Sequence, residues 1–234
     1  MKEHFRGRAI ILSRRDVGEA DRIIRVFFED RGREAVSARG VRKPQAKLRG
    51  MLEPTMEVEL QCVESKGLSV VTGAALVEPH ESLMHDYDAL VAAQGILEIT
   101  EKTLAEHSSE SNWYEFLRAA LGIMSAHPQD ASLRRLVWVT ALIKNLHNHG
   151  ISPVLQPDLR YLQLRDGVFS NTDGVELSTA ALKLWRVWRD YRIEQLAKIQ
   201  GIESALIELE PIVQAFWSMQ TGIERLRTRS LVGS

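Results

Sequence analysis

Hydrophobic and polar residues alternate at every second position along several short stretches of the first 80 residues. The clearest stretch is 56–64, where Met56, Val58, Leu60 and Cys62 fall on one face and polar or charged residues on the other. A two-residue period is typical of a strand with one buried face. The expected strands cover residues 8–13, 22–28, 34–38, 56–64 and 68–77. Five short strands with no helical pattern between them predict a small β-barrel.

The connections between these strands are short and marked by glycine, with one exception. Ser65-Lys66-Gly67 indicates a tight turn, whereas the connection from Val41 to Leu52 is rich in arginine and lysine. It is too long and too polar for a hairpin turn. We therefore expect an irregular basic connection between the third and fourth strands.

The period changes at Pro79, and from Leu83 onward the chain has a helical pattern. An apolar stripe runs through residues 133–146, and Gly150 follows it where a C-terminal cap would stand. Ser178 is suited to cap the start of a further helix. The second half of the chain is therefore expected to be mainly α-helical.

Two more signals refine the helical half. Leu177 and Leu182 flank Ser178 as a hydrophobic staple, and Pro211 stands where the first turn of a last helix tolerates it. Between these helices, residues 161–169 hold an Asp-Gly pair with apolar neighbours. That arrangement predicts a small β-hairpin.

Together these patterns predict an α+β fold with two domains. The first domain, residues 1–80, is a five-stranded barrel, and the second, residues 81–234, is mainly α-helical with a hairpin insertion at about 158–172. A composition of 44% hydrophobic and 26% charged residues is typical of a globular protein. The single cysteine, Cys62, excludes an internal disulfide and a cysteine-rich zinc site.

No apolar run approaches the roughly 18 residues that a membrane span requires. The run at residues 9–12 is too short for the core of a signal peptide. We therefore expect a cytoplasmic protein with no membrane contact.

Charge is distributed unevenly along the chain. The total of 30 basic and 31 acidic residues gives a formal net charge of −1. Residues 1–50 hold 14 basic and 7 acidic side chains, a net +7, which leaves 16 basic and 24 acidic ones, a net −8, for the remaining 184. The protein therefore has a basic head and an acidic body.

Signs of catalysis are absent from the sequence. It has neither a phosphate-binding loop nor a dinucleotide-binding glycine fingerprint. Cys62 falls on the apolar face of its strand, and His147 and His149 fall at a helix end, where imidazoles complement the helix dipole. Asp86 and Asp88 stand near a helix start, where acids are favoured. We predict no enzyme activity, no cofactor, no metal and no small-molecule substrate.

Residues 39–50, which we call the basic loop, hold five cations and no acid. A charge run of this kind is often a solvated surface, but such surfaces normally mix both signs. Like charges within one loop repel one another, and the binding of a polyanion is the usual reason for such a loop. The basic loop therefore predicts a nucleic-acid partner.

Aromatic residues are scarce in the barrel, where Phe5, Phe27 and Phe28 are the only ones. Because neighbouring strand residues face opposite ways, at most one of Phe27 and Phe28 is expected to be exposed. Binding should then depend on phosphates, be independent of sequence and be sensitive to salt.

The basic loop and its surroundings resemble the N-terminal domain of the bacterial RecO recombination mediators. The resemblance is carried by Arg8–Leu12, Gly18–Arg22, Gly32–Arg33, Ala38–Lys43 and Leu48–Pro54. The helix that opens at Leu133 and ends near Pro153, and the closing segment 226–231, are similar to later parts of that family.

This resemblance implies an oligonucleotide-binding (OB-fold) barrel that binds single- and double-stranded DNA and anneals complementary strands. It implies partnership with RecR, and often RecF, in loading RecA onto strands coated by single-strand-binding protein (SSB). The expected location is the bacterial nucleoid. Many members hold zinc with four cysteines, but this chain has no cysteine between Gly150 and Ser178, so a zinc-free variant is expected.

The resemblance also assigns residues to roles. The expected phosphate contacts are Arg39, Arg42, Lys43, Lys47 and Arg49, followed by Arg14, Arg15 and Arg22. Arg134 and Arg135 resemble the position where the acidic tail of SSB docks. Two alternatives remain open: an adaptor whose basic loop binds acidic peptides, and an RNA-binding barrel.

Overall fold

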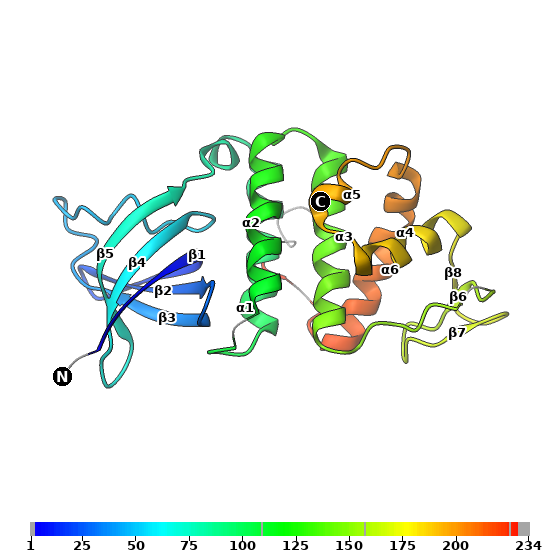
Figure 1. The fold of residues 1–234 in the computed structure, drawn as a ribbon, viewed down its shortest axis with the longest axis horizontal. Coiled ribbons are helices and arrows are strands. Elements are labelled where there is room, and N and C mark those ends of the chain that lie inside the picture. Colours follow the sequence, from blue (N-terminus) through cyan, green and yellow to red (C-terminus); the bar gives the residue numbers. More distant parts are fainter. Residues whose placement is uncertain (1–2, 109, 157, 225, 229–234) are drawn as a thin grey trace. The chain divides into compact units, whose positions relative to one another are not determined.

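The computed structural model describes residues 3–108, 110–156, 158–224 and 226–228 (Figure 1). The chain forms two compact units, Met1–Ser125 and Ala126–Ser234. The first unit holds the barrel and two helices. The expected domain boundary near residue 80 stays a prediction, because the barrel packs with the helices that follow it.

Five strands form a closed barrel in the first unit, as the alternation predicted, and Figure 1 shows them in blue to cyan. They are β1 (His4–Val17), β2 (Asp21–Phe28), β3 (Gly32–Ala38), β4 (Glu57–Val63) and β5 (Ser69–Glu78). Their order around the barrel is β1-β2-β3-β5-β4, with β3 and β5 parallel and all other neighbours antiparallel. The predicted α+β fold with an N-terminal five-stranded barrel is confirmed.

The interior of the barrel follows the predicted alternation. Val58, Leu60 and Cys62 point into the core and are at most 1% exposed. Phe27 and Phe28 are both buried, which agrees with the prediction that at most one of them is exposed. Phe28 belongs to the barrel core, whereas Phe27 stacks on Tyr114 outside it.

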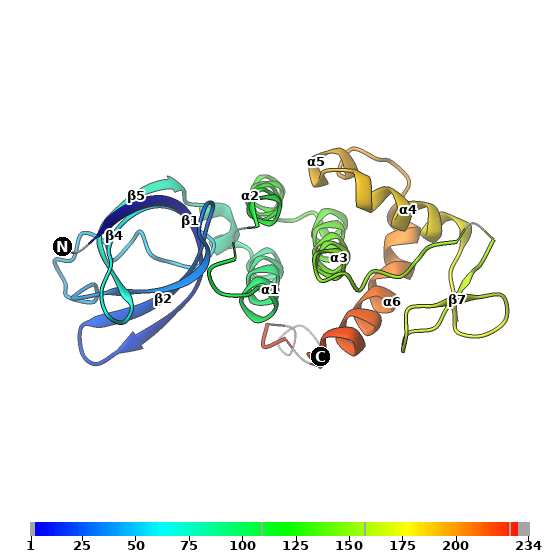
Figure 2. The same ribbon diagram turned by 60° about the horizontal axis from the view of Figure 1, so that its bottom comes forward.

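Two helices and a 3-10 turn complete the first unit: η1 (Glu81–His85), α1 (Tyr87–Thr103) and α2 (Ser111–Ala126). Figure 2 shows α1 and α2 side by side next to the strands. The hydroxyl of Tyr114 donates to the buried carboxylate of Glu57 at 2.9 Å, which joins α2 to β4. Gly32 lies so close to the α1–α2 connection that a Cβ atom there would meet the Ser108 carbonyl oxygen at 2.0 Å. Only glycine fits that approach.

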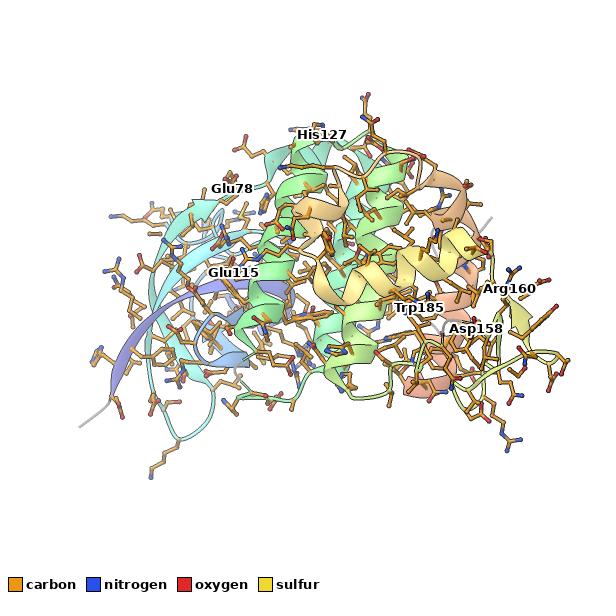
Figure 3. The ribbon with its side chains drawn as sticks, turned by 45° about the vertical axis from the view of Figure 1, so that its right-hand side comes forward. Glu78, Glu115, His127, Asp158, Arg160 and Trp185 are labelled. Atoms are coloured by element: carbon orange, nitrogen blue, oxygen red, sulfur yellow. The ribbon has the colours of Figure 1, made fainter. Side chains whose placement is uncertain are left out.

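The second unit contains four helices and a small sheet in its described part. The helices are α3 (Ala131–Asn148), α4 (Thr179–Asp190), α5 (Ile193–Leu196) and α6 (Glu203–Thr221); the strands are β6 (Tyr161–Leu162), β7 (Phe169–Ser170) and β8 (Val175–Glu176). The predicted hairpin is β6 with β7, but β8 pairs with the other edge of β6 and makes three strands. Trp185 of α4 lies in this unit (Figure 3) and is buried.

The predicted helix ends are confirmed. Gly150, at φ 68°, ends α3, and the Ile151 amide donates to the Leu146 carbonyl while the Gly150 amide donates to the His147 carbonyl. These two bonds form a Schellman motif. The Ser178 side chain accepts from the Ala181 amide at the start of α4.

The expectation for Pro211 is wrong. This residue lies inside α6 instead of in its first turn. An interior proline removes one helical hydrogen bond, yet α6 continues through Pro211. The helix packs on α3, where the Trp217 indole donates to Asn145 at 2.7 Å. Residues 229–231 of the closing segment lie outside the described part. In the described part, the helices are too short or too polar to cross a membrane.

Candidate nucleic-acid interface

The basic loop is a series of tight turns. The Lys43 amide donates to the Gly40 carbonyl, the Ala46 amide to the Lys43 carbonyl, and the Arg49 amide to the Ala46 carbonyl, at 3.0–3.2 Å. Bonds between residues three apart define β-turns. The loop therefore has a defined path although it is neither helix nor strand.

Apolar side chains fix both ends of the basic loop to the barrel. Val41 and, just beyond the loop, Leu52 are at most 1% exposed and belong to the barrel core, against which Leu48 also packs. Their burial removes apolar surface from water and opposes detachment of the loop. The cations between them are thus presented from a fixed base.

Polar contacts hold the start of the basic loop against the β1–β2 hairpin. The Gly40 amide donates to the Asp21 carboxylate at 2.7 Å, and the Arg42 amide donates to the Ala20 carbonyl at 2.9 Å. The Arg42 guanidinium also donates to the Gly18 carbonyl at 3.0 Å. The hairpin and the loop therefore form one surface.

Three of the predicted contact residues take part in an ion-pair network at this junction. Arg22 is buried and lies 2.8 Å from Asp16 and 3.2 Å from Glu53. Arg14 pairs with Glu53 at 2.9 Å, and Arg42 lies 3.3 Å from Asp16. The hydrogen bond from Arg22 lowers the pKa of Asp16, while desolvation opposes this shift. Direct phosphate contact by these three arginines stays a prediction, and the geometry favours a positioning role for Arg22.

The other predicted cations are exposed. Arg39, Lys43, Lys47 and Arg49 form no ion pair within the part of the chain that the structure describes, and the same holds for Arg15. An open hollow of about 440 Å³ lies at the loop. It is lined by Gly40, Lys43, Pro44, Gln45 and Ala46. These charges can therefore meet phosphate oxygens without first breaking an internal contact.

Base stacking has little support in the barrel. Phe5 is half-buried, with the guanidinium of Arg31 4.0 Å from the centre of its ring, and packs edge-on against Phe28. Because the barrel presents cations and not aromatic faces, it is suited to phosphates and not to bases.

The two arginines predicted to bind a partner lie on α3. Arg135 pairs with Glu210 of α6 at 2.7 Å, and Arg134 donates to the Pro128 carbonyl. Asp130 caps the same helix by accepting from the Leu133 amide. A peptide carboxylate at Arg135 would therefore compete with Glu210, and binding at this position stays a prediction.

The residues weighed for catalysis occupy structural positions. Burial raises the pKa of the Cys62 thiol to about 12, so this thiol is protonated and shielded at neutral pH. His147 and His149 are exposed at the end of α3, and Asp86 caps α1 by accepting from the Ala89 amide. Among the described residues, no three His, Cys, Asp or Glu side chains gather as a metal site requires.

Sequence reasoning missed the acids that organise this surface. Asp16, Asp21 and Glu53 each bind a cation or a backbone amide at the edge of the basic loop. Their signal was present in the sequence as isolated acids beside turns in a basic segment. Their partners could not be identified, because they lie far away along the chain, as Arg14 does from Glu53.

Two protein-family models match the chain: Recombination protein O N terminal over residues 1–80 and Recombination protein O C terminal over residues 84–230. A DNA repair protein RecO of Syntrophomonas wolfei is 24% identical over 222 residues, covering 88% of this chain and 87% of that protein. Those of Desulforamulus reducens and Bifidobacterium animalis are 30% and 32% identical over 126 and 137 residues. These two matches cover 54% and 58% of this chain, and 49% and 57% of the relatives.

Proposed function

The chain belongs to the RecO family of DNA repair proteins, and we propose that its basic loop binds single- and double-stranded DNA without sequence specificity. Its role lies in DNA repair and recombination. The observation that supports the proposal most is the exposure of Arg39, Lys43, Lys47 and Arg49 on a loop held to the barrel.

Charge neutralisation accounts for strand annealing in this proposal. Two complementary strands repel each other, and a basic surface bound to one lowers the barrier to the approach of the other. Each phosphate contact also releases condensed counterions, which favours binding at low salt. The lack of exposed aromatics on the barrel leaves the bases free to pair.

The proposal includes partners but no catalytic step. The protein would act with RecR, and often RecF, to load RecA onto DNA coated by SSB, with Arg134 and Arg135 receiving the acidic SSB tail. It would act as a mediator, and not as an enzyme, at the nucleoid in the cytoplasm. The pairing of Arg135 with Glu210 implies that tail binding exchanges one carboxylate for another.

DNA binding is tested by the salt dependence of affinity for a labelled single strand, measured by fluorescence anisotropy. The four exposed cations of the basic loop and Arg15 would make five phosphate contacts. Five contacts predict a slope of about −3.5 for the logarithm of the binding constant against the logarithm of the salt concentration. The quadruple variant Arg39→Gln/Lys43→Gln/Lys47→Gln/Arg49→Gln should reduce the slope to about −0.7.

A matched control neutralises two arginines and two lysines that are exposed in the second unit. It carries Arg160→Gln, Arg165→Gln, Lys183→Gln and Lys198→Gln. Figure 3 shows Arg160 at the edge of that unit. This control should keep the wild-type slope, and equal slopes for the two variants would refute the assignment. Competition with an RNA strand of the same sequence tests the RNA-binding alternative.

Annealing and partner binding have separate tests. Annealing of complementary strands at two salt concentrations, with and without SSB, should lose its salt-sensitive acceleration in the loop variant. Binding of a peptide with the acidic SSB tail should survive in that variant and weaken in Arg135→Gln. Tail binding lost in the loop variant but kept in Arg135→Gln would move the tail site to the basic loop.

A further inference from the structure

Four large apolar side chains are exposed within twelve consecutive residues of the first unit, at the junction between β5 and α1. Leu76 and Val77 are 44% and 41% exposed near the end of β5, and Met84 and Tyr87 are 50% and 61% exposed on η1 and at the start of α1. Single exposed apolar residues are ordinary, but four large ones in so short a segment point to an interaction site.

The junction is rigid, although it connects two elements. Leu83 anchors η1 in the core, and the Ser82 hydroxyl donates to the Ser125 carbonyl of α2 at 2.5 Å. Asp86 caps α1, and η1 packs against α1. The exposed side chains therefore stand on a base that need not order itself when a partner binds, which reduces the entropic cost of binding.

The charge around these side chains is negative. The chain has no lysine or arginine between Lys66 and Lys102, and Glu78, Glu81 and Asp88 are exposed there. Figure 3 shows Glu78 at the end of β5. On α2 of the same unit, Arg118 is paired with Glu115 at 2.7 Å.

We propose that this junction patch docks a cationic, amphipathic segment of a partner protein. The patch comprises Leu76, Val77, Glu78, Glu81, Met84 and Tyr87. The pairing of β5 with β4 shifts register at Val77, and this bulge interrupts the alternation of faces between Leu76 and Val77. Exposed apolar side chains with carboxylates between them along the segment complement a helix that carries apolar residues on one face and Lys or Arg beside them. The same carboxylates repel phosphates, so DNA does not compete for the patch.

The size of the patch sets the strength of the contact. Stable interfaces use about 20–30 residues on each side. A patch of six residues therefore suits a transient, salt-sensitive contact with a short segment. Because it uses no residue of the basic loop, partner and DNA can be bound at once, and the proposal does not depend on DNA binding.

The test uses a fluorescein-labelled 14-residue peptide of leucine and lysine, arranged as an amphipathic helix, and the full chain. Anisotropy should show saturable binding that weakens with salt. Met84→Ser/Tyr87→Ser should raise the Kd at least about tenfold, because the peptide would bury two fewer large apolar side chains on binding. Glu78→Gln/Glu81→Gln should weaken binding less and reduce its salt dependence.

Matched controls distinguish binding at the patch from nonspecific binding to exposed apolar residues. Val154→Ser/Met219→Ser changes two exposed apolar residues of the second unit and should leave the Kd unchanged. A peptide with glutamate in place of lysine should not bind. DNA binding should be the same in all variants, which keeps failure here distinct from failure of the basic loop.

Three outcomes would overturn the proposal. The first is that the peptide does not bind, and the second is that the patch variant and the control variant lose peptide affinity equally. The third is a concentration-dependent dimerisation in sedimentation velocity that the Met84→Ser/Tyr87→Ser variant abolishes. The last would show that a second copy of the chain covers the patch.

Discussion

The Nε atom of Arg22 donates a 2.8 Å hydrogen bond to the carboxylate of Asp16, directly across the β1–β2 ladder. The same guanidinium reaches Glu53 at 3.2 Å, just after the basic loop. One buried side chain thus connects two strands with the chain that returns from the loop. This contact links the stability of the barrel to the geometry of its charged surface.

Replacing Arg22 by methionine should lower the free energy of unfolding by about 2 kcal/mol, because hydrogen bonds to charged groups are lost. Arg14 and Arg42 still face Glu53 and Asp16, which limits the loss. Urea unfolding monitored by circular dichroism measures the change. Arg39→Met, at an exposed residue, should stay within about 0.5 kcal/mol of wild type. Equal stabilities for the two variants would exclude a positioning role for Arg22.

Two neighbouring arginines should differ in their effect on DNA binding. Arg15 has no ion pair within the described residues, whereas Arg14 pairs with Glu53. Arg15→Gln should therefore reduce the single-strand salt slope by about 0.7, and Arg14→Gln by clearly less. Both variants remove one charge from adjacent positions, so each is the control for the other. The reverse order would show that the Arg14–Glu53 pair opens on DNA.

The bond between Tyr114 and Glu57 should stabilise the first unit. Tyr114→Phe leaves a carboxylate that is 3% exposed without this donor, which should cost about 1–3 kcal/mol. Thermal unfolding checks the loss. The control, Tyr87→Phe, removes a hydroxyl from a ring that is 61% exposed and should be silent. A Tyr114→Phe variant as stable as the wild type would mean that this hydrogen bond adds nothing to the attachment of α2.

Cys62 should report the opening of the barrel. With its pKa raised from 9.0 to about 12 by burial, the native thiol should react with iodoacetamide at pH 8 at least about a thousandfold more slowly than in urea. A rate close to that of the unfolded chain would show that the barrel opens readily.

The same pKa shift predicts a pH dependence of stability. A folded pKa above the unfolded value contributes stability below pH 9, and this contribution is lost as the pH rises toward 12. The urea midpoint should therefore fall more steeply above pH 9 in wild type than in Cys62→Ala. Parallel pH profiles would contradict a buried thiol.

Local patterns determined the elements of this fold. The alternation through Val58, Leu60 and Cys62 predicted a strand and its buried face, because successive side chains of a strand point to opposite faces of the sheet. Gly150 and Ser178 predicted helix ends, because capping depends on residues a few positions apart. Pro211 was misplaced, because a proline favours a first helical turn locally, whereas α6 begins at Glu203 and packs on a distant helix, α3.

The sequence by itself determined that a basic segment of residues 39–50 lies in a β-barrel head, and its resemblance to one family was confirmed. Only the tertiary structure decided which cations remain exposed. Lys43 and Arg49 stay unpaired in the described part, whereas Arg22 is neutralised by Asp16 and Glu53. Spacing along the chain cannot reveal this difference, because the attraction between two charges depends on their distance in space.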